Sequence, residues 1–249
     1  AVVDIKGAIA DDANASADFV IAAMRSALED PGSRALVLLI NSPGGSPVQA
    51  GMINDEIVRL KAMHNKPIYA VVEETCASAA YYIAAAADEI FVDKASVVGS
   101  IGVLMDGFGF TDAMEKLGVE RRLLTAGSNK GMLDPFSPLS ESQRAHAQTM
   151  LNQIQAQVID VVRAGRGDRL KENEDTFSGL FWTGQQAVEL GLADKFGTLD
   201  SVARDIVKAE QVIDYTRSEN MAERFAKRFG AAVGGGAVEA LHGRLPAIR

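Results

Sequence analysis

The chain contains 249 residues, of which 47% are hydrophobic and 23% are charged. Both proportions are ordinary for a globular protein, so the composition excludes a disordered chain and allows a large core without metal or disulfide support. The net charge of −8 excludes the usual kind of nucleic-acid surface, because neutralising phosphates requires an excess of lysine and arginine. We therefore expect no nucleic acid among the partners.

Cysteine and histidine are scarce in this chain. Cys76 is the single cysteine, so no disulfide can form within the sequence. His64, His146 and His242 are too far apart in sequence to suggest a local metal cluster. We predict no structural metal and no cofactor.

No apolar run in the sequence reaches the length of about 18 residues that a membrane-spanning helix needs. The longest candidate, 77–87, is rich in alanine and contains two tyrosines, so we expect the chain itself to be soluble. The sequence starts at Ala1 without a methionine and enters a strand-like run at once. We therefore expect an upstream leader or membrane anchor that is absent from this chain.

Strand-like and helix-like segments alternate along the first half of the chain, a pattern that predicts βαβ units and a mainly parallel sheet. The continuous apolar run at 35–40 is typical of a strand buried on both faces. We expect strands at 1–9, 35–40, 68–72, 90–92, 97–103 and 121–125. The sequence therefore predicts an α/β fold in which helices pack around a sheet of repeated βα units.

Helices are predicted where apolar residues recur at helical spacing. The apolar faces consist of Val20, Met24, Ala27 and Leu28 in the first helix, of Val48, Met52, Ile57 and Leu60 in the second, and of Met150, Ile154, Val158 and Val161 in a long later helix. Ser140 and Gln143 form a capping box at the start of the long helix, which ends at Gly165. Shorter helices are expected at 78–88, 112–117, 183–191 and 199–207.

The sequence changes character near residue 210, so we predict a main domain at 1–210 and a C-terminal extension at 211–249. In the extension, Met221, Phe225 and Phe229 recur at helical spacing among basic residues. An amphipathic basic helix of this kind packs on its own domain, on a partner subunit or on an anionic membrane, and we favour the first two.

Three short motifs follow expected strands, at the edge where parallel α/β sheets place functional sites. The first is Asn-Ser-Pro-Gly-Gly at 41–45. Its two glycines allow backbone N–H groups to approach a ligand closely, although the motif alone would be interpreted as a turn.

The second motif places Ser78 where a strand ends and a helix begins. The unpaired N–H groups of a helix start would stabilise an alkoxide or an oxyanion nearby. A serine at such a position is more commonly only an N-cap. We assign Cys76, two residues earlier, to packing, because a free cysteine is usually a small buried hydrophobic residue.

The third motif is the loop 127–132, in which Lys130 stands among small and apolar residues with no acid before Asp134. The usual role of such a lysine is a solvated loop residue. A lysine that acts as a base must lose its proton, which requires a local structure that excludes water.

Taken together, these motifs resemble the signal peptide peptidase A family in its short bacterial form. The resemblance rests on Asn-Ser-Pro-Gly-Gly at 41–45, Ala-Ser-x-x-Tyr-Tyr-Ile at 77–83 and Gly-Ser-Asn-Lys at 127–130, and it covers about residues 1–210. It implies a ClpP/crotonase-like α/β fold and a peptidase that uses a serine–lysine dyad.

The resemblance also implies a role for single residues. Ser78 would be the nucleophile and Lys130 the general base, with the Ser100 hydroxyl orienting the lysine. The N–H groups of Gly45 and Ala79 would bind the oxyanion. This chain has Ala-Ala at 79–80 where many relatives have Gly-Gly, which is a departure at the second oxyanion donor. Ser100 could instead only satisfy a backbone group at a strand end.

The same residues allow interpretations other than the dyad. A Clp-type Ser-His-Asp triad is disfavoured because 88–134 contains no histidine. A crotonase-like acyl-CoA enzyme would need a carboxylate at the site, for which Glu73 and Glu74 are the candidates, on a strand expected to be buried. A non-catalytic scaffold of membrane complexes is disfavoured because serine, lysine and the glycine loop are all retained.

We expect the substrate to be an extended hydrophobic peptide, such as a spent signal peptide, bound by strand addition beside the glycine loop. Leu104, Met105 and Met132 are the candidate contacts for its side chains. A general peptidase for misfolded chains is the alternative. The resemblance further implies a ring-like homo-oligomer held at the bacterial inner membrane by a segment absent here, with the catalytic domain periplasmic or otherwise extracytoplasmic.

Overall fold

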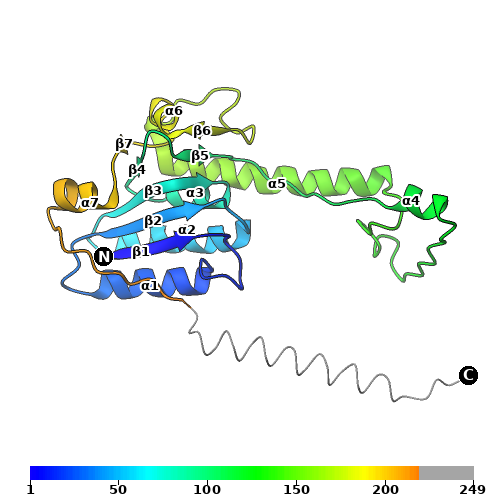
Figure 1. Cartoon of the computed structure of the whole chain (residues 1–249), viewed down its shortest axis with the longest axis horizontal. Helices are drawn as coiled ribbons and strands as arrows, with labels where there is room; N and C mark the ends of the chain where they lie inside the picture. Colours follow the sequence, from blue (N-terminus) through cyan, green and yellow to red (C-terminus); the bar gives the residue numbers. More distant parts are fainter. Residues whose placement is uncertain (219–249) are drawn as a thin grey trace, which may run out of the picture.

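The computed structural model describes residues 1–218, and its core is a seven-stranded sheet with helices around it (Figure 1). The parallel strands lie in the order β1 (Val2–Lys6), β2 (Leu36–Ser42), β3 (Ile68–Ala77), β4 (Glu89–Val92) and β7 (Lys195–Phe196). Strand β5 (Val97–Gly99) also pairs with β3, and β6 (Phe181–Thr183) pairs antiparallel with β5. The predicted α/β class with a mainly parallel sheet is confirmed.

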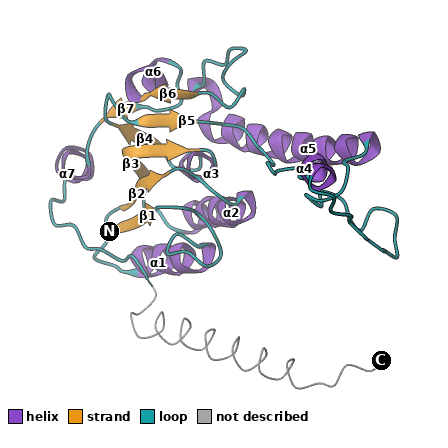
Figure 2. Ribbon diagram, turned by 45° about the vertical axis from the view of Figure 1, so that its right-hand side comes forward, coloured by secondary structure: helices purple, strands orange, loops and turns teal. Residues whose placement is uncertain are grey.

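Helices α1 (Ala17–Glu29), α2 (Pro47–Met63) and α3 (Ala79–Ala84) lie on one side of the strands, with α7 (Leu199–Ser201) on the other (Figure 2). The chain continues from α7 into a π-helical turn at Val202–Val207, so the single helix expected at 199–207 is split. All four apolar residues predicted to face inward on α1 are buried. The larger core therefore forms between the sheet and the first three helices.

The inner face of α2 differs from the one predicted. Ile53, Ile57 and Leu60 are buried, whereas Val48 and Met52 are 67% and 44% exposed. The buried residues repeat at intervals of four and three, which is one helical face, so Val48 and Met52 necessarily point away from it.

After β5 the chain leaves the core and forms an arm, which we define as residues 103–150 (Figure 1). The arm contains α4 (Thr111–Lys116) and the outer part of α5 (Glu141–Arg166), and none of residues 104–146 is buried. The predicted strand at 121–125 is wrong: these residues are irregular and exposed. A strand needs a neighbour to accept and donate its backbone hydrogen bonds, and no described strand lies beside this segment.

Helix α5 begins with the predicted capping box between Ser140 and Gln143 and ends one residue beyond the predicted stop. Val158 is buried, whereas Met150 is 37% exposed, because the outer part of α5 has no sheet beneath it. The short strands β6 and β7 and the short helix α6 (Gly184–Glu189) return the chain to the core. Neither strand was predicted, because two or three residues show no periodicity.

The last described residues bond to the edge of the sheet. The Val2 N–H donates to the Ile213 carbonyl and the Tyr215 N–H donates to the Val2 carbonyl, both at 2.9 Å. The division at residue 210 stays a prediction, and the amphipathic helix expected around Met221 lies outside the described residues. Within residues 1–218, none of the helices has both the length and the apolar character that crossing a bilayer requires.

Candidate active site

Ser78 is the single residue between the end of β3 and the start of α3, and its backbone is strained. Its φ of 54° and ψ of −121° lie in a region that L residues rarely adopt. The Ser78 N–H donates to the Gly99 carbonyl at 2.8 Å, which fixes the turn against β5. The hydroxyl makes no capping hydrogen bond, so Ser78 is not a conventional N-cap.

The glycine loop lies directly against this turn. Gly44 has φ of 101°, and a Cβ atom added to it would lie 2.8 Å from the Ser78 Cβ. A Cβ atom on Gly45 would collide with the Ile9 carbonyl, because the loop is bridged to Ile9. Both glycines are therefore required by close backbone approach, as the sequence suggested.

Two backbone N–H groups beside Ser78 have no partner among the described residues. The bridge to Ile9 uses the N–H groups of Ile9 and Ser46 and leaves that of Gly45 unused. Ala79 is the first residue of α3, so its N–H has no intrahelical acceptor. The presence of Ala instead of Gly at position 79 does not remove this donor, since the N–H belongs to the backbone.

A cavity of about 520 Å³ opens at this point. It is lined by five of the residues predicted for the site, namely Gly45, Ser78, Ala79, Ser100 and Leu104. The residues that sequence reasoning missed include Pro47, Tyr82, Val158, Ser178 and Gly179. In the sequence Val158 is visible only as part of an apolar stripe, and the pair at 178–179 carries no signal.

Ser100 also lines this cavity. It follows Gly99 with a φ of 50°, and its N–H donates to the Leu180 carbonyl at 2.8 Å. Ser100 and Ser78 therefore line the same cavity.

The structure does not bring Lys130 to Ser78 within one chain. Lys130 is exposed in the loop between α4 and α5, and the neighbouring Met132 lines a different cavity with Gln143 at the start of α5. From Gln143 to Val158, which lines the Ser78 cavity, α5 rises by about 22 Å at 1.5 Å per residue. Met105 lines a third cavity, on the arm.

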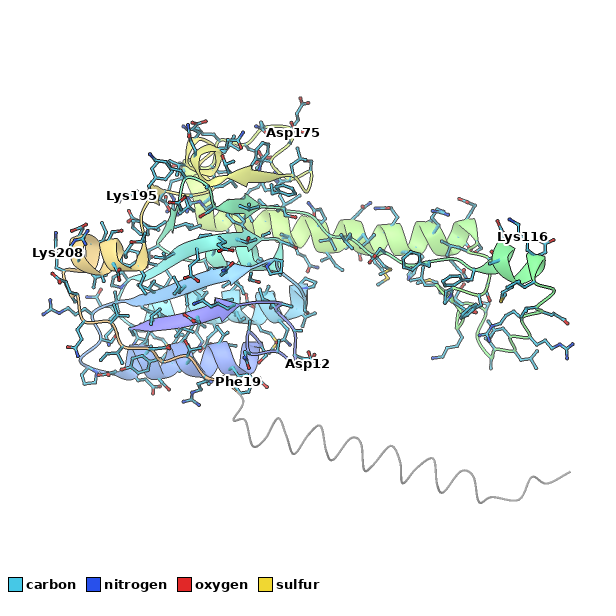
Figure 3. All side chains as sticks on the ribbon, viewed as in Figure 1. Asp12, Phe19, Lys116, Asp175, Lys195 and Lys208 are labelled. Carbon is cyan, nitrogen blue, oxygen red and sulfur yellow. The ribbon has the colours of Figure 1, made fainter. Side chains whose placement is uncertain are left out.

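Figure 3 shows how far the arm extends from the rest of the chain. Lys116 of α4 marks the outer end of the arm, far from Asp175 in the loop that leads to the cavity wall at 178–179.

The residues that the alternative mechanisms would need do not line the Ser78 cavity. His146 is exposed on the arm and lines the cavity of Met132. Glu73 is exposed and pairs with Lys6 at 3.3 Å on the sheet surface, so it does not serve an acyl-CoA site near Ser78. Cys76 is fully buried, and burial raises the pKa of its thiol, which agrees with a packing role.

The sequence profile of Peptidase family S49 matches residues 61–213. The chain is 45% identical over 181 residues to a Na(+)/H(+) antiporter NhaA of Brucella melitensis, which covers 73% of the chain and 25% of that protein. It is 31% identical over 188 residues to a protein of Enterococcus faecium provisionally named signal peptide peptidase SppA, covering 76% of the chain and 54% of that protein.

A third relative is Protease 4 of Haemophilus influenzae, with 28% identity over 218 residues that cover 86% of the chain and 35% of the relative. The chain thus spans between a quarter and about half of the length of these relatives. The family match covers more than half of the chain and includes Ser78 and Lys130, and the sheet agrees with the ClpP/crotonase-like fold that the motifs implied. The chain belongs to Peptidase family S49, the family of signal peptide peptidase A.

Proposed function

We propose that the chain is a serine endopeptidase that cleaves hydrophobic peptides with Ser78 as nucleophile and Lys130 as general base. The observation that carries this proposal is the strained Ser78 turn, which lies between two unpartnered N–H groups at the wall of a cavity. Strain of this kind costs on the order of 1–3 kcal/mol and persists where function requires it.

The Ser78 turn and the two N–H groups beside it suit a conventional acyl-transfer sequence. The Ser78 Oγ attacks the scissile carbonyl, and its proton passes to the neutral Lys130 amine. The negative charge that develops on the carbonyl oxygen is stabilised by the N–H groups of Gly45 and Ala79. The protonated lysine then gives its proton to the leaving amine, and a water molecule hydrolyses the acyl-enzyme in a second cycle. Ser100 supplies a hydroxyl that can orient the lysine between these steps.

The lysine of each site comes from a second copy of the chain. Within one chain the two residues are separated by roughly the length of the arm, and Lys130 is exposed. Docking the arm of one copy over the Ser78 cavity of another would bring the residues together and exclude water from the amine.

The arm has the surface for such an assembly. Its exposed apolar side chains are Leu104, Met105, Phe108, Phe110, Leu117, Val119, Leu123, Leu124, Leu133, Phe136, Leu139 and Met150. So many exposed apolar side chains in one region are typical of an association surface. A homo-oligomer in which each arm lies on the next copy buries it, and repetition of that contact closes a ring.

The substrate class follows from the lining of the cavity. Pro47, Tyr82, Val103 and Val158 provide an apolar surface with no charged side chain among the described lining residues. An unpaired charge would be costly to bury there, so short apolar peptides such as remnant signal peptides fit best. Such peptides occur at the bacterial inner membrane, and we propose that the extracytoplasmic face of that membrane is where the enzyme acts.

A fluorophosphonate probe tests the chemistry. We expect the full chain to be labelled at Ser78, identified by mass spectrometry of the tryptic peptide, and Ser78→Ala to remain unlabelled. Cleavage of a mixed peptide library tests the substrate class, with cuts expected beside small or apolar residues. Labelling at another residue would overturn the mechanism, whereas efficient cutting beside Asp, Glu or Lys would overturn only the substrate class.

A further inference from the structure

A single side-chain amide joins the two walls of the Ser78 cavity. Gln155 lies on α5, one turn before Val158 of the cavity lining. Its Nε2 donates to the Ile101 carbonyl at 3.3 Å and to the Phe177 carbonyl at 3.1 Å. The two segments that these carbonyls belong to are distant in sequence, and one nitrogen atom holds both.

The residues next to these two carbonyls form the two walls of the Ser78 cavity. Ile101 lies between Ser100 and Gly102, and Phe177 directly precedes Ser178 and Gly179; all four of these neighbours line the cavity. A Cβ atom on Gly102 would lie 3.0 Å from the Gly179 Cα, so the walls are already in close contact. Their separation is therefore sensitive to whatever holds them.

A second contact from α5 fixes the same loop. The Arg163 guanidinium lies 5.1 Å from the centre of the Phe177 ring and forms an ion pair with Glu172. Figure 2 shows the loop between α5 and β6 beside the inner end of α5. Arg163 thus contacts the Phe177 ring, while Gln155 bonds to the Phe177 carbonyl.

The chemistry of the contact requires glutamine at this position. The Gln155 Oε1 is buried and has no hydrogen-bond partner among the described residues. A buried acceptor without a partner costs about 1–3 kcal/mol, which offsets much of what the two hydrogen bonds contribute to stability. A glutamate has no proton to offer when charged, and an asparagine is one methylene too short to reach both carbonyls.

We infer that Gln155 is a positioning residue that sets the width of the Ser78 cavity by joining its two walls, and thereby limits the size of the substrate side chain. This inference rests on the proposed function, since it concerns the selectivity of that site. Its two hydrogen bonds keep the walls closed around a small side chain. Without them the walls separate and a larger side chain is admitted.

The test compares Gln155→Leu with Gln153→Leu in the full chain. Leucine at 155 removes both hydrogen bonds and the unpartnered oxygen but leaves the Ile101 and Phe177 carbonyls without this donor, so the thermal midpoint is measured for both variants. Gln153 is exposed on the same helix and makes no described side-chain hydrogen bond, which makes it a matched control. Two peptides are compared that differ only in having Ala or Leu before the scissile bond, and kcat/KM is measured for each.

We expect Gln155→Leu to shift the Leu-to-Ala ratio of kcat/KM by about tenfold towards Leu, mainly through KM. The size of an apolar pocket usually discriminates between side chains of different length by a factor of this order. Gln153→Leu should leave the ratio unchanged, and labelling of Ser78 by a small fluorophosphonate should stay within about twofold in both variants. Gln155→Asn, which keeps the amide but cannot bridge, should reproduce the shift if the leucine variant folds poorly.

The outcomes distinguish a failure of this inference from a failure of the proposed function. An unaltered ratio in both Gln155 variants, with Ser78 still labelled, would show that Gln155 is only structural and would overturn this inference alone. A lower thermal midpoint without a change in the Leu-to-Ala ratio would likewise show that Gln155 is only structural. If the unmodified chain is not labelled at Ser78, the proposed function fails and the inference with it.

Discussion

Gly44 packs against Ser78 so closely that no other residue fits: an added Cβ atom would lie 2.8 Å from the Ser78 Cβ and 2.7 Å from the Ala77 carbonyl oxygen. The φ of 101° at Gly44 adds backbone strain for any L side chain. We expect Gly44→Ala to lose at least about 2 kcal/mol of unfolding free energy and nearly all peptidase activity. Urea unfolding and peptide hydrolysis measure the two effects, and a stable, active variant would contradict the geometry described here.

The strain at Ser78 can be separated from its chemistry. Replacing Ser78 by glycine removes the steric cost of a positive φ, so we expect Ser78→Gly to be more stable by about 1 kcal/mol and inactive. Ser78→Ala keeps the Cβ atom and should be inactive with nearly unchanged stability. Thermal unfolding of both variants provides the comparison. Equal stabilities of the glycine and alanine variants would argue against strain at this turn.

The assembly of the site from two copies predicts complementation. Ser78→Ala and Lys130→Ala should each be inactive alone, whereas co-refolding them in equal amounts should restore about a quarter of the activity, since half of each residue is intact and they meet at random. Lys130→Arg alone should also be inactive, because arginine keeps its proton and cannot act as the base. No recovery in the mixture would place both residues in one chain or assign the base to another residue.

Arg166 anchors α5 in the core through a buried ion pair. Its side chain is 0% exposed and binds both carboxylate oxygens of Asp194, at 2.8 and 2.9 Å. We expect Arg166→Met to reduce the unfolding free energy by about 3 kcal/mol, because it leaves a largely buried carboxylate poorly compensated. The double variant Arg166→Met/Asp194→Leu should lose less than the sum of the single losses. Additive losses in urea unfolding would mean that the pair is not coupled.

Glu56 joins α1 to α2 and predicts a dependence of stability on pH. Hydrogen bonds from Arg59 lower the pKa of this carboxyl from its usual 4.5 to about 2, helped by Arg25 and opposed by burial. Because the folded-state pKa is depressed, the stabilisation is complete above pH 4.5 and is lost as the pH falls through about 2.

Glu56→Gln should therefore lower the free energy of unfolding by on the order of 2 kcal/mol at pH 6, a figure that allows for the half-exposed arginines. This loss should become progressively smaller below pH 4.5. The exposed pair of Glu120 and Arg122 provides the control, since Glu120→Gln should have no measurable effect on unfolding at either pH. A Glu56→Gln deficit that does not shrink in acid would contradict the assignment.

The sequence by itself determined the α/β class and the local chemistry of the site. A buried strand such as 35–40 and the capping box of Ser140 depend on near neighbours in the chain, so their patterns are visible without coordinates. The same holds for the Ser78 turn, because a strand end, a serine and a helix start follow one another directly. The glycine loop was recognised for the same reason.

Only the tertiary structure decided what depends on contacts between distant segments. The failed strand at 121–125 has suitable residues but no neighbouring strand, and Val48 and Met52 are apolar but lie off the buried face of α2. The spacing between Ser78 and Lys130 in sequence gave no hint that an arm separates them. The Gln155 contact was equally invisible, because Gln155 and its two carbonyl partners meet only when α5 packs beside two unrelated loops. Such contacts are set by the direction in which whole elements leave the core, which no local pattern of residues specifies.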